Sequence, residues 1–389
     1  MALVKSLTKT KTIKNYRQTM SPAKSVINRH FVSCGVAING PAPDDITVHN
    51  ERFYNRVLTG GSLGLGEAYM DGWWDCPALD AFFTKILSRE IYLKMSISLP
   101  MIMAVLTGSL TNLARSQAFR IGKAHYDIGN DFYRAMLGNN LVYSCGYWKN
   151  ADSLEEAQVA KLDLICRKLG LRPGQRVLDI GCGWGGFARY AATNYGVSVT
   201  GITVSREQER LAREFNRGLP VEIRYQDFRE VKEVFDHIVS IGMFEHVGYK
   251  NYREYMKVIR RSLSNDGLFL LHTIDSLSTS INQEPWIAKY IFPNSKLPSI
   301  KQIAHAIEGL FVLEDLENFG ADYDRTLMAW HQNFELHWPE FRPEYNERFY
   351  RMWRYYLLMC AGSFRARLCQ LWQVVLSKRG VPGGYQSIR

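Results

Sequence analysis

The stretch that decides the fold is VLDIGCGWGG, residues 177–186. An apolar, strand-like run carries the acid Asp179, and Gly181, Gly183 and Gly185 follow before a helical pattern begins. Glycine permits a tight turn and a close approach of the backbone to a ligand. The spacing lacks the third glycine of the pyrophosphate fingerprint, and no GKS or GKT follows to make a phosphate loop. S-adenosylmethionine therefore fits this loop better than NAD or ATP, with Asp179 and the three glycines as candidate cofactor-binding residues.

Around this loop, strand-like and helix-like segments alternate. Ser153 and Glu156 have the spacing of a capping box and predict a helix that reaches about Gly170. The strand-like segments that follow are 176–180, 197–203, 221–227, 235–242 and 267–274, separated by the helix-like segments 187–195, 206–213 and 252–262. Strands separated by helices at this rhythm predict an α/β fold with a parallel, doubly wound sheet. Further along, 311–320 is strand-like, and 327–338 and 346–378 are amphipathic, the last with the pattern of a C-terminal helix rich in aromatic residues and Arg.

The first 120 residues have a different texture. Residues 1–30 contain Lys and Arg but no Asp or Glu. We expect a flexible arm that either lies on a polyanion or is simply solvated. After short strand-like runs, the glycines at 60, 61, 64 and 66 break any long periodicity and indicate a compact mixed module around Trp73 and Trp74. Residues 95–114 carry no charge, but polar residues and Pro100 argue against a membrane span and favour a packed or interfacial helix.

Composition excludes several classes of protein. Of the 389 residues, 46% are apolar, which excludes a disordered or fibrous chain, and the net charge is +10. The seven cysteines are scattered without metal-ligand spacing, so we expect no metal site and a reducing compartment. The N-terminal residues lack a continuous apolar run, so we expect no secretory signal, and no signature of nucleic-acid binding appears. The expected location is the cytoplasm.

With its surroundings, the glycine loop resembles the class I S-adenosylmethionine-dependent methyltransferases and, within them, the bacterial cyclopropane-fatty-acyl-phospholipid synthases. The resemblance runs from about Ala37 to the C-terminal helix and leaves residues 1–30 outside. The strings that carry it are AINGPAP (37–43), GSLGLGEAYMDGWWDC (61–76), GKAHYDIGNDFY (122–133), YSCGYW (143–148), GMFEHVG (242–248), LHTI (271–274), YIFPN (290–294), NFGADYDRTLMAW (318–330) and CAGSFRAR (360–367).

The resemblance implies a set of cofactor contacts. The three glycines would line the methionine side of S-adenosylmethionine, and Tyr143 with Ser144 would close over it. Thr203 and Gln208 would reach the ribose, at a place where many methyltransferases have a carboxylate. Gln226 and Asp227 would bracket the adenine, with Asp227 accepting from its amino group. The alternative for this last pair is that they merely end a strand.

The resemblance also implies a reaction and its base. Methyl transfer to a cis double bond leaves a carbocation, which aromatic faces can stabilise; Tyr323, Phe244 and Tyr147 are candidates. A proton must then leave the new methyl group so that the ring closes. In the family the base is a bound bicarbonate ion. The resemblance implies that the side chains of Glu245, His272 and Tyr323 and the backbone groups of Cys145 and Ile274 hold it. From the residues alone, Glu245 could equally be a helix N-terminal carboxylate and His272 a core histidine.

Cys360 lies in a family string and is expected near the site, but no arrangement of Cys, His and Asp makes it or Cys145 a nucleophile. His246 and His125 are interpreted as structural. Two other readings stay open: a related lipid methyltransferase that yields methyl-branched chains, and a basic membrane- or RNA-binding protein with a relic enzyme fold.

The implied domains are an arm (1–30), an N-terminal mixed α+β lipid- and membrane-binding domain with a linker (31–120) and a Rossmann-like catalytic domain (121–389). The implied partners are a phospholipid acyl chain, the inner membrane as a peripheral docking surface, and a second copy in a homodimer.

Overall fold

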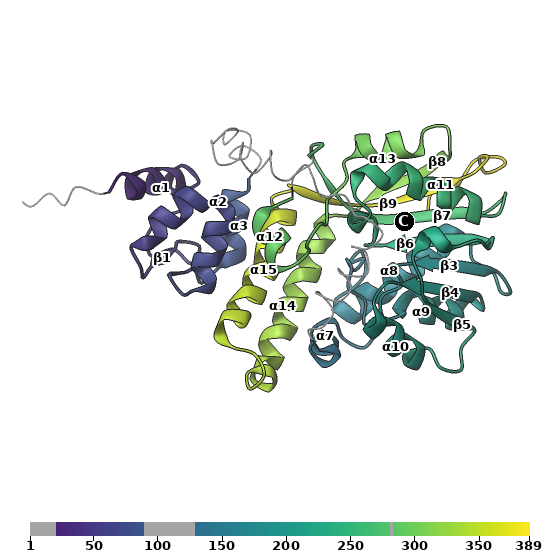
Figure 1. Cartoon of the computed structure of the whole chain (residues 1–389), viewed down its shortest axis with the longest axis horizontal. Coiled ribbons are helices and arrows are strands. Elements are labelled where there is room, and N and C mark those ends of the chain that lie inside the picture. The colour runs from purple at the N-terminus through teal and green to yellow at the C-terminus, as the bar shows by residue number, and fades with distance from the viewer. Residues whose placement is uncertain (1–20, 89–128, 281–282) are drawn as a thin grey trace, which may run out of the picture.

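The computed structural model describes residues 21–88, 129–280 and 283–389. At its centre lies a sheet of seven strands in the order β5-β4-β3-β6-β7-β9-β8 (Figure 1). The strands are β3 (Arg176–Ile180), β4 (Ser198–Thr203), β5 (Val221–Tyr225), β6 (His237–Ile241), β7 (Leu268–Ser276), β8 (Val312–Asn318) and β9 (Cys369–Ser377). Strands β3 to β7 pair in parallel, which confirms the predicted doubly wound α/β fold.

The last two strands of the sheet depart from the parallel arrangement. Strand β9 runs antiparallel to both β7 and β8. The physical reason is the helical hairpin between β8 and β9, α14 (Ala321–Phe341) and α15 (Glu347–Arg365). Its two helices carry the chain away from the sheet and back to the end of β8, where Asn318 pairs with Trp372. A strand that re-enters at that end runs antiparallel to β8.

Helices cover both faces of the sheet. They are α8 (Leu154–Leu169), α9 (Gly186–Tyr195), α10 (Arg206–Phe215), α11 (Tyr252–Ser262) and α13 (Ile300–Ile307). The predicted capping box begins α8, because Ser153 Oγ accepts from the Glu156 N–H at 3.2 Å and Glu156 Oε2 accepts from the Ser153 N–H at 3.1 Å. Apolar residues of α8 and α9 pack on one face and those of α11 and α13 on the other. The sheet core is therefore dry on both sides, as a doubly wound fold requires.

The predicted helix-like segment 346–378 is divided in the structure. Helix α15 ends at Arg365, and Leu371–Leu376 is buried within β9. A strand buried on both faces has a continuous apolar run rather than an alternating one, so its pattern cannot be told from that of a buried helix. The aromatic residues of the segment belong to α15, which packs against α14, and α14 also packs against α7 (Asn130–Leu137).

The N-terminal module contains more helix than its glycines suggested. Its elements are α1 (Pro22–Ser33), β1 (Thr47–Val48), α2 (Arg52–Met70), β2 (Trp74–Asp75) and α3 (Leu79–Ile86). Helix α2 runs through the glycine cluster and is broken only at Gly61, where φ is +55°. Helix α1 begins inside the segment expected as an arm, and it buries Ala23 and Ile27. Residues 1–20 lie outside the described part of the chain.

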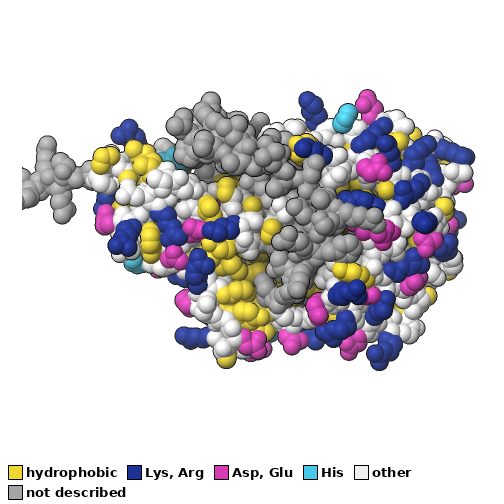
Figure 2. Space-filling model, viewed as in Figure 1, with side chains coloured by type: hydrophobic (Ala, Val, Ile, Leu, Met, Phe, Trp, Pro, Cys, Tyr) yellow, Lys and Arg dark blue, Asp and Glu magenta, His cyan; other side chains and the backbone are white. Residues whose placement is uncertain are grey.

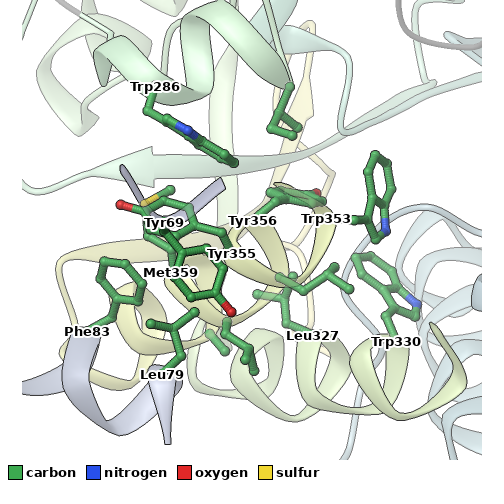
Figure 3. Packing of buried hydrophobic residues seen from close by; sticks show 14 of the residues in the cluster. Tyr69, Leu79, Phe83, Trp286, Leu327, Trp330, Trp353, Tyr355, Tyr356 and Met359 are labelled. Atoms are coloured by element: carbon green, nitrogen blue, oxygen red, sulfur yellow. The ribbon is translucent and has the colours of Figure 1, made fainter. Parts of the chain in front are cut away.

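Aromatic packing joins this module to the C-terminal hairpin. Tyr355 of α15 meets Trp286 of α12 (Pro285–Tyr290) at 4.5 Å between ring centroids, Phe83 of α3 at 5.0 Å and Tyr69 of α2 at 5.5 Å (Figure 3). The rings come from both ends of the sequence and form one continuous core. Relative motion between the module and the hairpin would therefore expose large aromatic surfaces.

The expectations of no membrane-spanning helix and no metal site can be compared with the structure only for the described residues. Among helices in the described ranges, none is long and apolar enough to cross a membrane. The segment 95–114 and His125 lie outside those ranges. Within the same ranges, no group of three or more His, Cys, Asp or Glu residues could hold a metal ion.

Candidate active site

A cavity opens where strands β3, β4, β5 and β6 end, at the edge where doubly wound sheets bind their ligands. Nine of the ten residues predicted to bind the cofactor line it: Tyr143, Ser144, Asp179, Gly181, Gly183, Thr203, Gln208, Gln226 and Asp227. Gly185 is the exception, because it faces Asn216, and a Cβ there would lie 2.4 Å from Asn216 Nδ2. Gly185 therefore packs α9 against the end of α10, and it does not line the cavity.

The glycine loop is bound to the neighbouring strand. The backbone N–H groups of Gly181 and Cys182 both donate to the Ile202 carbonyl at 3.0 Å. Gly181 has a φ of +81°, and a Cβ at this position would come within 2.7 Å of Met243 Cγ. Both features require glycine here. The loop thus lies directly against Met243, which lines the same cavity.

The polar residues toward β4 and β5 are partly paired with each other. Thr203 Oγ1 lies 2.8 Å from Gln208 Oε1, and both side chains are buried. The Asp227 carboxylate accepts from the Arg229 N–H and from its guanidinium, each at 2.9 Å. Asp227 therefore already has a cationic partner, and Arg229, which sequence reasoning missed, also lines the cavity.

At the other end of the cavity Asp179 is fully buried and has no partner. Both of its carboxylate oxygens lack a hydrogen bond within the described part of the chain. Burial raises its pKa to about 7, against an opposing effect from Lys161. An unpaired buried carboxyl group in a cavity fits a cationic ligand group such as an α-ammonium.

Two side chains of α8 that sequence reasoning missed hold the segment beside Asp179. Gln158 donates to the Ser144 carbonyl and Lys161 donates to Ser144 Oγ, each at 2.8 Å. Lys161 also lines the cavity and is completely buried. The sequence signal was present, since both are polar residues on the apolar face of an amphipathic helix.

Glu245 lies immediately outside the cavity, in a short 3-10 helix (Phe244–His246) that follows β6. Its Oε1 accepts from the Ile274 N–H at 2.7 Å, and its Oε2 is buried and has no hydrogen-bond partner in the described part of the chain. Burial raises the pKa of Glu245 to about 7. The Ile274 N–H, expected to contact bicarbonate, is thus already donated to Glu245 in this structure.

His272 lies inside β7, where it pairs with Ile241, the last residue of β6 that pairs with β7. Its Nδ1 is 3.3 Å from Gln373 Nε2, and its Nε2 is buried with no partner among the described residues. Burial, together with the nearby charges of Lys161 and Lys168, lowers the pKa of His272 well below its ordinary value. The ring is therefore neutral near pH 7.

Tyr323 of α14 is the third residue predicted to hold bicarbonate by its side chain. Glu245, His272 and Tyr323 are called the second cluster below. Burial raises the pKa of Tyr323 well above the ordinary value, and Cys145, Glu245 and Cys360 lie near enough to add to the rise. Burial also raises the pKa of the Cys145 and Cys360 thiols, so neither supplies a thiolate near pH 7. Cys145 Sγ instead lies 3.8 Å from Thr326 Oγ1.

Two side chains are placed otherwise than expected. Phe244, a candidate for stabilising a cation, is fully buried and stacks on Tyr252 with 4.1 Å between centroids, so it belongs to the core under the site. His246, interpreted as structural, lines the cavity, and burial lowers its pKa to about 4. Tyr147 remains near the second cluster, with its ring 5.3 Å from that of Phe319, which in turn lies 5.8 Å from His272.

Comparison with known proteins decides the family. The model of the family described as "Mycolic acid cyclopropane synthetase" matches residues 114–374. The chain belongs to this family. It is 54% identical over 365 residues to cyclopropane-fatty-acyl-phospholipid synthase of Escherichia coli K12, covering 94% of this chain and 95% of that protein.

Solved structures agree with this membership. The cyclopropane synthase MmaA2 from Mycobacterium tuberculosis is 33% identical, with a TM-score of 0.64, and the match covers 69% of this chain and all of that one. The mycolic acid cyclopropane synthase CmaA1, solved in complex with SAH and CTAB, is 32% identical with a TM-score of 0.63, over 67% of this chain and 98% of that one. The protein is accordingly an S-adenosylmethionine-dependent methyltransferase of the cyclopropane synthase family.

Proposed function

We propose that the protein transfers the methyl group of S-adenosylmethionine to a cis double bond of a phospholipid acyl chain and closes the product to a cyclopropane ring. One observation carries the proposal. Near the cavity lie the buried side chains of Glu245, His272 and Tyr323, of which Glu245 is close enough to Tyr323 to raise its pKa, and among the described residues Glu245 Oε2 and His272 Nε2 have no partner. The identity to the Escherichia coli enzyme over nearly the whole chain supports the same reaction.

The side chains of the cluster meet the needs of the chemistry. An isolated double bond is a weak nucleophile, so the site must position the reactants and exclude water. Glu245 is 5%, His272 1% and Tyr323 8% exposed, so the cluster is dry. The faces of Tyr323 and Tyr147 are the aromatic surfaces available to a carbocation, now that Phe244 is assigned to the core.

We propose that this cluster also holds bicarbonate. When bound, bicarbonate supplies the base that accepts the proton released as the ring closes. The fit rests on Glu245 Oε2 and His272 Nε2, which are buried and which no described residue contacts by a hydrogen bond. A neutral His272 can donate to a small anion, and a Glu245 carboxyl group with a pKa of about 7 can exchange a proton with it. Tyr323 and the Cys145 backbone are further contacts, and Ile274 acts by holding Glu245 in place.

Exposed hydrophobic side chains support binding of an acyl chain and docking on a membrane. Hydrophobic side chains gather over α14 and α15 on the face shown in Figure 2. On α14, the Leu336 side chain is 72% exposed. We propose that residues 31–120 bind lipid and that residues 121–389 carry catalysis. In this proposal, the protein docks peripherally on the cytoplasmic side of the inner membrane as a homodimer. Vesicle sedimentation at rising salt and analytical ultracentrifugation test docking and dimerisation separately; a monomer, or binding to no vesicle, would remove that part of the proposal.

The deciding experiment incubates the protein with labelled S-adenosylmethionine and vesicles of a cis-unsaturated phospholipid, then examines the fatty acid methyl esters by mass spectrometry. The proposal predicts a gain of one CH2 in a product that resists hydrogenation. A methyl-branched product would overturn ring closure and the base assignment, and absence of label would overturn the acceptor.

Variants and buffer composition test the base. Glu245→Gln, His272→Gln and Tyr323→Phe should each lose most ring formation, whereas Glu254→Gln, an exposed change on α11, should keep it. Removing dissolved CO2 should lower the wild-type rate, and added bicarbonate should restore it. A rate indifferent to bicarbonate would contradict the anion while leaving the methyl transfer intact.

A further inference from the structure

Three polar side chains form a row across the last three strands of the sheet. His272 of β7 pairs with Gln373 of β9, and Gln373 pairs on its other side with Glu317 of β8. Residues directly opposite each other in antiparallel strands project from the same face of the sheet. All three side chains are buried, and Gln373 interrupts the apolar run 371–376. Buried polar groups are costly unless they are paired, so the contacts along the row decide whether it is tolerated.

At one end of the row, the Glu317 carboxylate has partners for both of its oxygens. Its Oε2 forms an ion pair with Lys168 Nζ at 2.5 Å, and its Oε1 accepts from the Tyr147 hydroxyl at 3.4 Å. Arg389 Nε lies 3.8 Å from the same Oε1. The carboxylate therefore does not need the amide group of Gln373 as a donor, and that group can serve the other end of the row.

At the other end, Gln373 Nε2 lies 3.3 Å from His272 Nδ1. An amide nitrogen donates and does not accept, so Nδ1 is the acceptor and carries no proton. In a neutral imidazole the proton is then on Nε2. This is the ring nitrogen that has no hydrogen-bond partner among the described residues. The bond at Nδ1 thus makes Nε2 a donor.

We propose that Gln373 is a positioning residue that fixes the tautomer of His272, so that the Nε2–H group is the donor offered to the small anion of this site. His272 then holds the anion and does not accept the proton released on ring closure, because its Nε2 already carries one. The inference rests on the proposed function for the identity of the anion. The tautomer itself can be measured without lipid, cofactor or turnover.

The first test is a nitrogen NMR spectrum of the protein with isotope-labelled histidine. Protonated and bare ring nitrogens differ in chemical shift, and correlations with the ring C–H protons distinguish Nδ1 from Nε2. The signals of His272 are those lost in His272→Gln. In the wild-type protein near neutral pH we expect a protonated Nε2 and a bare Nδ1, and this measurement requires no Gln373 variant to fold. A proton on Nδ1, or on both nitrogens, would overturn the proposal.

Gln373→Glu tests whether the amide sets the tautomer. The variant has nearly the same shape, but its carboxylate accepts where the amide donates, so a proton should appear on Nδ1 of His272. An unchanged spectrum would overturn the proposal.

The matched control is the same change three residues earlier on β9, Gln370→Glu, on the opposite face of the strand. Gln370 Oε1 accepts from Asn318 Nδ2 at 2.5 Å and from Trp372 Nε1 at 3.4 Å, and a carboxylate can keep both bonds. The His272 signals should be unchanged in this variant. A change of tautomer in the control as well would overturn the assignment to Gln373.

Kinetics then separate positioning from a general loss of structure. In buffer depleted of CO2, Gln373→Glu should need about 10- to 100-fold more added bicarbonate for its half-maximal rate, the range for one charged hydrogen bond, while its affinity for S-adenosylhomocysteine stays within about threefold. An unchanged bicarbonate requirement, or an equal loss of S-adenosylhomocysteine affinity, would overturn the positioning role. A wild-type protein that forms no ring or ignores bicarbonate would instead contradict the proposed function, and the spectrum would still decide the tautomer.

Discussion

Gly66 of α2 lies directly against the indole of Trp286 in α12: a Cβ on Gly66 would come within 2.3 Å of Trp286 Cδ1. Trp286 is completely buried and donates to Met70 Sδ at 3.3 Å. The absence of a side chain at residue 66 therefore allows the N-terminal module to reach the segment that follows β7.

Replacement of Gly66 should therefore loosen the module. Gly66→Ala forces the indole or α2 to shift, and we expect a loss of about 1 to 3 kcal/mol in the free energy of unfolding. Gly60→Ala is the control on the same helix, because a Cβ there meets nothing within 4 Å. It should be neutral or stabilising by up to about 1 kcal/mol. Urea denaturation measures both, and equal effects would contradict the close-contact interpretation.

The buried pair of Lys168 and Glu317 should behave as a unit. Lys168→Met leaves the Glu317 carboxylate buried without its cation, and we expect a loss of about 3 to 5 kcal/mol. Adding Glu317→Leu removes the stranded charge and should recover most of the loss. A double-variant cycle by urea denaturation measures the coupling; additive effects would show that the pair does not interact.

Thr326 holds the segment 143–148 in place. This segment lines the cavity at Tyr143 and Ser144 and comes close to Tyr323 at Cys145. The fully buried hydroxyl of Thr326 accepts from the Gly146 N–H at 3.0 Å and from Trp148 Nε1 at 2.8 Å, and donates to the Asp322 carbonyl at 3.0 Å. Thr326→Val has nearly the same shape but strands two buried donors, so we expect a loss of about 2 to 4 kcal/mol. Thr326→Ser keeps the hydroxyl and should lose about 1 kcal/mol for the missing methyl group. Thermal unfolding compares them, and a Val variant as stable as the Ser variant would contradict this role.

Glu245 should make stability depend on pH in a definite direction. Its pKa is about 7 in the native state, against an ordinary 4.5, so between these values the native protein binds more protons than the unfolded chain. The contribution of this group to stability therefore falls as pH rises through that window. Glu245→Gln does not titrate, so its stability relative to wild type should improve by about 3 kcal/mol from pH 4.5 to pH 8. Chemical denaturation at both pH values measures this change, and a difference independent of pH would show that the carboxyl group is not desolvated.

Local patterns predicted those parts of the fold that depend on neighbours in sequence. The capping box at Ser153, the glycine loop and strands β3 to β7 all follow from spacing within a few residues. Helix α2 was missed because glycine disfavours helices only weakly, whereas burial of residues such as Tyr69 and Met70 outweighs that preference. Strand β9 was missed because its partners β7 and β8 are distant in sequence, and an apolar run alone does not choose between a helix and a strand.

For the candidate site, too, the sequence predicted some features and missed others. Nine predicted cofactor residues line one cavity, since motifs at the ends of parallel strands meet at one edge of the sheet. The structure places Gly185 against Asn216, occupies the Ile274 N–H with Glu245, and removes Phe244 to the core. These outcomes depend on which atoms face each other across elements, a relationship that no spacing along the chain contains.

The sequence by itself determined the doubly wound fold, the family and the edge of the sheet where the cofactor residues gather, because repeating patterns of burial and glycine act locally. Only the tertiary structure decided which buried polar atoms are paired and which are not. Among the described residues, it gives Lys168 a carboxylate partner, gives Lys161 only the Ser144 hydroxyl, and leaves the Asp179 carboxylate without a hydrogen bond in the same cavity. The cost of burying a charge depends on every atom that surrounds it, and those atoms come from elements that only folding brings together.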